Sequence, residues 1–314
     1  MDRLVRWRVS TMATQIRMLQ MEDIPLLQAM ETGIKNDYIL RIAAHLMEGH
    51  NRLFGLFTDD RLVSFGGYSI FADHYAMLGR LRSDRHFMKN GYATELMRHI
   101  RDTAFYLPQV QWVGANTQED NLSARRVLEK INFHPHTILH GALTDNVSAL
   151  EEDASPWTEI TDLSRKREWL KHTYIEKKLV FPYECYYLFP SSPALFPDEV
   201  ISKWHFYENN NQTRYVITKK DRKKHHYIHI VYPWEDIFEQ TGLWKTVSHD
   251  YKQLIKEAHE ETYIWFDMPK KLAMSLPKNH HWSLPSPWIL YGMDRVTWEK
   301  SYNTLELSYD ESNV

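Results

Sequence analysis

The stretch FMKNGYATEL, residues 87–96, decides how the first half of the chain folds. It places Asn90 and Gly91 directly before a helix-like run, with the small residue Ala93 two positions after the glycine. Glycine adopts backbone conformations that other residues avoid and lets a ligand approach the main chain closely. Helix N-termini carry unpaired N–H groups and the positive end of the helix dipole. The stretch therefore predicts either an anion site, with phosphate as the anion, or an ordinary Asn-Gly turn that caps a helix.

The residues on either side of this turn predict an alternation of strands and helices. After the turn, one apolar stripe at helical spacing joins Ala93, Leu96, Met97, Ile100 and Ala104. Apolar periodicity and turn residues predict the other elements in the same way. They are a strand at 14–19, helices at 21–34 and 37–48, a hairpin over 52–71 that turns at Asp59-Asp60, strands at 75–83 and 110–117, a helix at 121–133 and a strand at 134–143.

Length and composition restrict the class of protein. A chain of 314 residues exceeds what one hydrophobic core usually holds, so we expect two domains. The net charge of −3 gives no overall footprint for a polyanion, and no apolar run has the ~20 residues of a membrane span. The single cysteine, Cys185, suits a reducing cytosol, so we expect a cytoplasmic protein and a small core side chain at that position. Residues 1–12 are basic without an apolar segment, so we expect a leader rather than a secretory signal.

Composition changes near residue 150. Nine of the 11 glycines lie at or before Gly141, whereas ten of the 13 prolines and nine of the 11 tryptophans follow residue 150. The polar, acidic segment 146–156 has the composition of a joint between domains. We therefore expect domains at 14–145 and 157–300, both of the α+β class, and only the first has the glycine supply for a tight ligand-binding loop.

Two motifs in the first domain resemble those of the GNAT superfamily of N-acetyltransferases. Residues 88–93, Met-Lys-Asn-Gly-Tyr-Ala, resemble the R/Q-x-x-G-x-G/A loop, and residues 121–133, NLSARRVLEKINF, resemble the N-x-x-A…L-Y-E-K-x-G-F helix. The resemblance covers residues 14–143 and implies the mixed α+β sheet of an acyl-CoA N-acyltransferase. It implies acetyl-CoA as cosubstrate, with its pyrophosphate on the backbone amides of the loop. It also implies that an amine attacks the thioester directly.

The resemblance further implies a set of cofactor-binding residues. The strand end near residues 81–83 would splay from the strand at 113–116. Backbone N–H groups in the gap between them would polarise the acetyl carbonyl. Asn121 would lie near the pantetheine, although a simple helix N-cap explains the same residue. The implied cofactor-binding residues are Leu81, Ser83, Met88, Lys89, Asn90, Gly91, Tyr92, Ala93, Thr94, Asn116 and Asn121.

Three positions depart from the family pattern. Met88 stands where Arg or Gln is usual, so Lys89 or Arg85 would have to supply the cation. Asn132 replaces a glycine and tolerates the left-handed conformation. Leu128 stands where many relatives have the tyrosine that protonates the CoA thiolate, so another donor or water serves, or catalysis is slow or lost. A CoA-binding sensor or regulatory protein is therefore the alternative to an enzyme.

The acid–base residues and the acceptor stay unassigned at this stage. Glu119, Asp120 and Asp84 all fall near strand ends as possible general bases, whereas Asp73 and His74 fall at a hairpin tip and are discounted. We expect the acceptor pocket to come from residues 31–50 and the second half of the chain. Within 31–50, solvated helix positions explain Asp37, Tyr38, His45 and His50 equally well. An amine is the expected partner, and the oligomeric state is open.

The second half repeats the order of the first without its glycine loop. Residues 158–163 are similar to residues 14–19, and the hairpins predicted at 214–233 and 52–71 both carry Asp-Arg at their turns. The elements predicted after the second hairpin are a helix at 248–260, a strand at 262–269, a short helix at 270–276 and a strand at 288–295. We weigh a degenerate GNAT-like repeat that does not hold CoA against an unrelated α+β domain.

Three further features of the second half favour structural over functional interpretations. The basic cluster at 219–226 is typical of nucleic-acid binders, but its position at a hairpin turn favours a solvated tip, so we expect no nucleic-acid partner. His225 and His229 would lie about 13 Å apart along one strand at ~3.3 Å per residue, so we expect no metal site. The tryptophans predict a core or an interface rather than a cleft.

Overall fold

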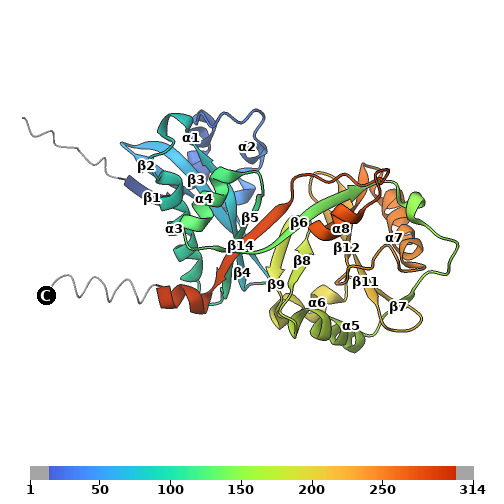
Figure 1. Cartoon of the computed structure of the whole chain (residues 1–314). Helices are drawn as coiled ribbons and strands as arrows, with labels where there is room; N and C mark the ends of the chain where they lie inside the picture. Colours follow the sequence, from blue (N-terminus) through green and yellow to red (C-terminus); the bar gives the residue numbers. More distant parts are fainter. Residues whose placement is uncertain (1–13, 302–314) are drawn as a thin grey trace, which may run out of the picture. The chain divides into compact units, whose positions relative to one another are not determined.

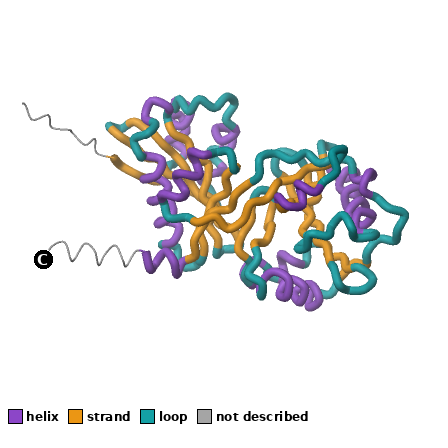
Figure 2. Tube along the Cα trace, viewed as in Figure 1, coloured by secondary structure: helices purple, strands orange, loops and turns teal. Residues whose placement is uncertain are grey.

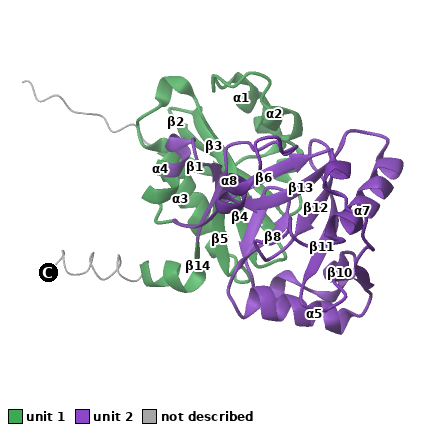
Figure 3. Ribbon diagram, turned by 45° about the vertical axis from the view of Figure 1, so that its right-hand side comes forward, with its two compact units in different colours: residues 1–115, 126–133, 293–314 green, residues 116–125, 134–292 purple. Residues whose placement is uncertain are grey.

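The computed structural model describes residues 14–301 (Figure 1). The basic leader expected at residues 1–12 lies outside the described residues. Helices and strands alternate along the chain (Figure 2), and they form two compact units (Figure 3). Among the described residues, the first unit comprises 14–115, 126–133 and 293–301, and the second comprises 116–125 and 134–292. Both units contain parallel and antiparallel strand pairs together with helices, which confirms the predicted α+β class.

The first unit is built on strands in the order β1-β2-β3-β4-β5. The first four are antiparallel to their neighbours, and β5 is parallel to β4 because the helix α3 carries the chain across. The strands are β1 Thr14–Met18, β2 Asn51–Thr58, β3 Arg61–Phe71, β4 Tyr75–Ser83 and β5 Trp112–Gln118. The helices are η1 Met21–Asp23, α1 Ile24–Ala29, α2 Tyr38–Ile42, η2 His45–Met47, η3 Arg85–Phe87, α3 Tyr92–Phe105 and α4 Leu122–Lys130.

The alternation of side chains along β2 shows how the first sheet is covered on both faces. Leu53 and Phe57 pack in one apolar cluster with Leu27 of α1 and Ile39 of α2. Phe54, one position along the strand, instead contacts the ring of His99 on α3 with centroids 5.8 Å apart. Because successive strand side chains point to opposite faces, α1 and α2 cover one face of the sheet and α3 covers the other.

The sequence predicted the turn of the first hairpin correctly but made the first helix too long. Asp59 and Asp60 both have positive φ, 47° and 61°, as a two-residue hairpin turn requires. The helix predicted at 21–34, by contrast, ends at Ala29. Gly33 and Asn36 have φ of 77° and 53°, so the segment that follows leaves the helical conformation and forms a loop.

The strands of the second unit follow the order β14-β6-β13-β12-β11-β10-β7, and β8 and β9 form a separate hairpin. The strands are β6 His134–Thr144, β7 Thr158–Ile160, β8 Val180–Glu184, β9 Tyr187–Pro190, β10 His205–Glu208, β11 Tyr215–Arg222, β12 His226–Val231, β13 Thr262–Pro269 and β14 Trp288–Asp294. The helices are η4 Val147–Leu150, α5 Leu163–Leu170, η5 Lys171–Ile175, η6 Pro193–Leu195, α6 Asp198–Ile201, α7 Leu243–Ala258 and α8 Lys270–Ser275.

Part of the second sheet follows the order and direction of the first. Strands β7, β10, β11 and β12 are antiparallel neighbours, β13 is parallel to β12, and α7 makes the crossover between them. Strand β6, from the end of the first sequence domain, pairs with both β13 and β14. This topology supports an internal duplication, which we keep as a proposal.

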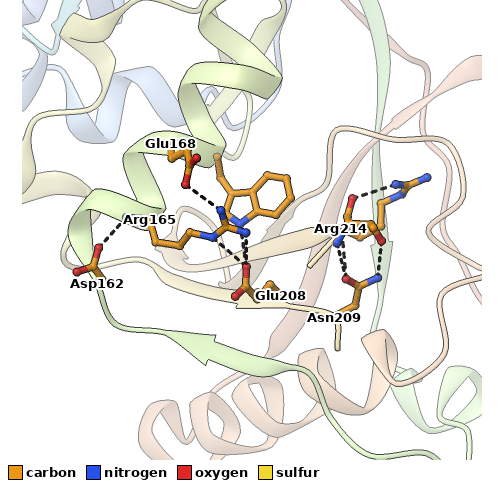
Figure 4. Close-up of polar contacts among 8 residues, drawn as sticks. Asp162, Arg165, Glu168, Glu208, Asn209 and Arg214 are labelled. Carbon is orange, nitrogen blue, oxygen red and sulfur yellow. Dashed lines mark hydrogen bonds and ion pairs between the residues drawn. The ribbon is translucent and has the colours of Figure 1, made fainter. Parts of the chain in front are cut away.

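Polar contacts hold α5 against β10 in the second unit (Figure 4). Asp162 caps the helix by accepting the N–H of Arg165 at 2.7 Å. The Arg165 guanidinium donates to Glu208 on β10 and to Glu168 on its own helix, at 3.0 and 2.8 Å. Because Arg165 is only partly exposed and bonds two carboxylates, this network fixes the position of α5 more firmly than a single surface ion pair would.

Two expectations for the second half were wrong. The helix predicted at 248–260 begins at Leu243, directly after Gly242. The basic cluster is not wholly a solvated tip, because Lys219 is buried on β11. Its ammonium donates to the carbonyls of Pro182 and Tyr183 and lies over the ring of Trp204. Burial lowers the pKa of Lys219 to about 8.

The tryptophans of the second unit lie mainly in its core. Trp244 and Trp282 belong to the large apolar cluster between α7 and the sheet, and Trp265 is almost fully buried on β13. This confirms the core interpretation for these three residues.

Among residues 14–301, no helix combines the length and the apolar character that crossing a membrane requires.

Two neighbouring glycines of the first sheet allow a direct test of its packing. A methyl group on Gly67 would lie 2.0 Å from the Arg52 carbonyl oxygen, whereas one on Gly79, the paired residue of β4, would meet nothing within 4 Å. We expect Gly67→Ala to lower the free energy of unfolding by about 3 kcal/mol because the strands must separate locally. Gly79→Ala should change it by less than about 1 kcal/mol. Urea unfolding of both variants checks this, and equal effects would contradict the packing described.

Candidate functional site

The loop before α3 has an unusual backbone that leaves its surface open. Lys89 and Gly91 both have positive φ, 69° and 86°, and Gly91 is the N-cap of the helix. A methyl group built on Gly91 would meet no atom within 4 Å. A left-handed residue at this point turns the chain sharply into the helix, and its missing side chain leaves the approach clear.

The first N–H groups of α3 are available to a ligand. The N–H groups of Thr94 and Glu95 are already occupied, because they donate to the Gly91 carbonyl at 2.9 and 3.0 Å. Within the described part of the chain, the N–H groups from Lys89 to Ala93 have no hydrogen-bond acceptor, and no side chain caps Gly91. Successive free N–H groups at the positive end of a 14-residue helix can bind an anion.

The side chains around the loop leave Lys89 as its nearest cation. Met88 is 58% exposed, and the Asn90 amide donates to the Phe87 carbonyl at 3.2 Å. Tyr92, Ala93 and Thr94 are partly buried in the first turn of α3. Arg85, the other substitute for the cation absent at Met88, pairs with Glu31 at 2.6 Å. Lys89 is exposed and has no ion pair among residues 14–301.

The end of β4 has no partner on β5 at the position where the resemblance implies a gap between the two strands. Pairing between β4 and β5 covers Tyr75–Leu78 and ends at Leu78 and Ala115, so within the described residues of the first unit Leu81 and Ser83 have no β5 partner. A bulge in the β3–β4 pairing, with Arg80 at φ 60°, bends β4 at this point. The Ser83 hydroxyl lies 3.0 Å from that of Ser64 on β3. Free backbone groups at a bulged strand end can bind a ligand.

Asn116, near the end of β5, and Asn121, directly before α4, fall in the stretch 116–125, which belongs to the second unit, and both have partners there. The Asn116 amide donates to the Tyr186 carbonyl at 2.6 Å, while its Oδ1 is buried without a partner among residues 14–301. Asn121 Oδ1 accepts the N–H of Ala124 at 3.2 Å, so this residue caps α4. Each residue thus has a structural role, and a role in cofactor binding remains a prediction for both.

The residues considered for proton transfer are mostly engaged in other interactions. Burial alone would raise the pKa of Asp84, but hydrogen bonds from His86 and Arg61 hold it below its usual value. Glu119 accepts both of its bonds from Lys270, at 2.6 and 2.7 Å, and Asp120 is exposed. Leu128 is 4% exposed and packs in the core, where it has no proton to donate. Asn132 has φ 63°, so it does adopt the left-handed conformation expected of it.

A buried ion pair that sequence reasoning did not assign lies next to the β4 edge. The Arg82 guanidinium donates to both carboxylate oxygens of Asp37, at 2.6 and 3.0 Å, and Asp37 also caps α2 through Ile39 N–H. The interpretation of Asp37 as a solvated helix residue was therefore wrong, whereas Tyr38, His45 and His50 are exposed. Only the N-cap position of Asp37 was visible in the sequence, because Arg82 lies 45 residues away.

The loop after α1 encloses a cavity within the first unit. This cavity of about 300 Å³ is bordered by residues 30–34 and by Asp37, Phe65 and Arg85. Asp37 and Glu31 provide carboxylates, and Phe65 provides an apolar wall. Both carboxylates are already paired, Asp37 with Arg82 and Glu31 with Arg85, so the cavity combines polar groups with an apolar wall but has no unpaired charge from these residues.

The second unit has a helix N-terminus like that of α3, but it is closed by the protein itself. Gly242, the N-cap of α7, has φ 81°, and a methyl group there would lie 2.2 Å from the Ser155 carbonyl oxygen. Trp157 donates its N–H to the Thr246 hydroxyl at 2.8 Å and its indole N–H to the Thr241 carbonyl at 2.9 Å. Trp244 stands two residues after this glycine, where Ala93 follows Gly91. This helix end therefore has no open surface for an anion.

Comparison with known proteins identifies the class of the first unit. A family model described as an acetyltransferase (GNAT) domain matches residues 25–134. These residues therefore form a GNAT acetyltransferase domain, of the class of N-acetyltransferases, as the two motifs predicted. No curated protein matches the chain significantly.

One solved structure has a similar fold over most of the chain. The GCN5-related N-acetyltransferase from Sphaerobacter thermophilus is 14% identical, with 90% of this chain and 96% of that chain covered and a TM-score of 0.53. The ribosomal-protein-S18-alanine N-acetyltransferase from Escherichia coli is 18% identical over 41% of this chain and 83% of that chain, with a TM-score of 0.37. Arabidopsis thaliana NAA60 in complex with acetyl-CoA is 14% identical over 41% and 91%, with a TM-score of 0.36. Of these three, the first shows a shared fold.

The Asp37–Arg82 pair makes the stability of the first unit depend on pH. Burial alone would raise the pKa of Asp37, but Arg82 and the Ile39 N–H hold it below its usual value. The stability from this pair is therefore complete above the unfolded pKa of about 4 and is lost as the pH falls through the lower, folded value. We expect Asp37→Asn to cost about 3 kcal/mol at neutral pH, because Arg82, whose side chain is only 17% exposed, would lose its partner.

This difference should be constant from about pH 7 to pH 5 and should shrink below about pH 4. Urea unfolding of the wild type and of Asp37→Asn across this range measures it. A difference that persists unchanged at low pH would show that the carboxylate charge is not its source.

Proposed function

We propose that the first unit binds acetyl-CoA and transfers the acetyl group directly to an amine. The observation that carries the proposal is the open N-terminus of α3, with free N–H groups around Gly91, inside a GNAT acetyltransferase domain. A diphosphate fits these groups because they converge at a positive helix end without a side chain in the way. Lys89 adds a positive charge to the same loop.

The residues of the chain would bind and orient the reactants. Acetyl-CoA would supply the acetyl group as a thioester. The backbone groups of Leu81 and Ser83, free on the β5 side, would donate to the acetyl carbonyl as its charge develops. Met88, Asn90, Tyr92, Ala93 and Thr94 would form the wall of the diphosphate loop, and Asn116 and Asn121 remain proposed contacts for the pantetheine.

We propose the cavity after α1 as the place where the acceptor enters. Residues 31–34 and Asp37, within the segment expected to form the acceptor pocket, border this cavity together with the apolar side chain of Phe65. The amine must lose a proton before it attacks, and the general base stays unassigned between Glu119, Asp120 and Asp84. Because Leu128 has no proton to give, water or another donor would protonate the CoA thiolate.

The second unit would not hold CoA, because Ser155 and Trp157 cover the N-terminus of α7. We keep the sequence domains 14–145 and 157–300 as a proposal, with the second as a degenerate repeat of the first. A nucleic-acid role gains no support, because Lys220, Arg222 and Lys223 pair with carboxylates in the second unit. We propose a cytoplasmic location on the single buried cysteine.

The diphosphate site can be tested by calorimetry with acetyl-CoA. We expect the wild type to bind one equivalent and Gly91→Glu to bind at least about 100-fold more weakly, because a carboxylate would repel the diphosphate and block the N–H groups. Gly49→Glu is the matched control: Gly49 also has positive φ and open space around it, but it lies outside the loop. Equal weakening by both variants, or by neither, would remove the proposed site.

Turnover separates the enzyme from the regulatory alternative, which Leu128 and Met88 motivate. We expect the wild type to release CoA thiol with at least one class of primary amine. The rate should rise with pH as the amine becomes neutral. Gly91→Glu should lower kcat/KM by at least about 100-fold. Tight CoA binding without thiol release across small amines, polyamines and peptide N-termini would instead establish a CoA-binding regulatory protein.

A further inference from the structure

Three side chains that lie far apart in the sequence meet inside the second unit. Cys185 belongs to the tight turn between β8 and β9, Asp221 lies on β11, and His229 lies on β12. The Cys185 sulfur, a carboxylate oxygen of Asp221 and a ring nitrogen of His229 all lie within 4.8 Å of one another. We call these three residues the Cys–Asp–His cluster. Strand pairing places Asp221 opposite Tyr227, so Asp221 and His229 are diagonal neighbours on one face of the sheet.

His229 is the group in this cluster that lacks a partner. Its side chain is 0% exposed. Its Nε2 lies 2.7 Å from Asp267 Oδ2 on β13, whereas its Nδ1 is buried without a hydrogen-bond partner among residues 14–301. When Nε2–H donates to a carboxylate, Nδ1 carries the free lone pair. This carboxylate–histidine arrangement is the one that orients histidines that bind metal ions.

The other two residues complete a mixed ligand set. The Cys185 backbone N–H donates to Asp221 Oδ2 at 2.7 Å and so orients the carboxylate beside the sulfur. A thiolate, an imidazole and a carboxylate together suit zinc and related transition metals rather than magnesium or calcium. The separations within 4.8 Å would close to about 3.5 Å around one tetrahedral ion, which side-chain rotation can supply.

The charges nearby can accommodate a divalent cation. Glu184, Asp221 and Asp267 provide carboxylates, and Lys219 and Lys223 provide the ammonium groups. Lys219 is held by backbone carbonyls and aromatic rings, and Lys223 pairs with Glu184 at 2.6 Å. With a neutral thiol and imidazole, carboxylates exceed ammonium groups by one. A divalent ion that displaces the thiol proton to solvent would leave the group neutral.

An opening beside the cluster provides space for a further ligand. Asp221, His229 and Lys219 border a cavity of about 240 Å³ in the second unit. We propose that Cys185, Asp221 and His229 bind one zinc-class transition metal ion, with a fourth position facing this cavity. Three protein ligands and one open position are the pattern of reactive rather than purely structural zinc sites. The site is separate from the proposed acetyltransferase chemistry and does not depend on it.

Cobalt(II) titration of the full-length, reduced protein tests this site. We expect one equivalent to bind, with a thiolate-to-cobalt charge-transfer band in the near ultraviolet and the intense visible bands of a tetrahedral ion. Zinc should displace the cobalt and abolish both signals. Cys185→Ser should lose the charge-transfer band, and His229→Gln should bind at least about 100-fold more weakly.

The matched control is His226→Gln, which changes a histidine of the same strand outside the cluster and should keep the complete signal. Asp267→Asn should keep the charge-transfer band but bind cobalt about 10- to 100-fold more weakly, because Asp267 only positions the ring. Circular dichroism confirms that each variant is folded. The wild-type titration decides the matter even if a buried variant does not fold. The absence of a charge-transfer band in the wild type, or its persistence in folded Cys185→Ser, would overturn the proposal.

Discussion

The arrangement on which the first unit depends is a left-handed glycine at the start of a long helix. Gly91 turns the chain so that consecutive N–H groups face outward at the positive end of α3. In the absence of a ligand these groups can be hydrated only because nothing covers them. The parallel β4–α3–β5 crossover fixes the direction in which α3 begins, and β4 loses its β5 partner beside the same point. The fold and the open helix end are therefore consequences of one crossover.

The second unit shows what the same crossover becomes when its helix end is covered. Gly242 repeats the left-handed cap of Gly91, and β12–α7–β13 repeats the parallel connection. Here, however, the Ser155–Trp157 segment fills the space beside Gly242, and Trp244 is buried in the apolar cluster. The space that an anion would occupy is taken by the backbone and aromatic side chains of the protein. The difference between the two halves is thus not the backbone path but what occupies the space in front of the helix.

Sequence reasoning succeeded wherever a short stretch determines the structure. The strand at 75–83, the hairpin turn at Asp59-Asp60 and the left-handed Asn132 all depend on local periodicity or on φ preferences. The Gly91 turn was found for the same reason. The early end of α1, the start of α7 and the burial of Lys219 depend on packing against residues far along the chain. The Asp37–Arg82 pair was likewise missed because no local pattern links residues 45 positions apart.

Buried charged and polar groups distinguish the second unit from a core built for stability alone. Lys219, His229 and Asp267 are all buried on neighbouring strands, and Asp221 adjoins them. Replacing such groups with apolar side chains of similar size is often neutral or stabilising. Stability therefore does not explain why polar groups lie at this position, least of all a histidine with one nitrogen unpaired. In the first unit the exposed polar groups surround an open helix end, whereas in the second they lie around an internal cavity. Two units with related strand order thus place their chemical groups at different locations, which is the pattern expected if each has its own ligand.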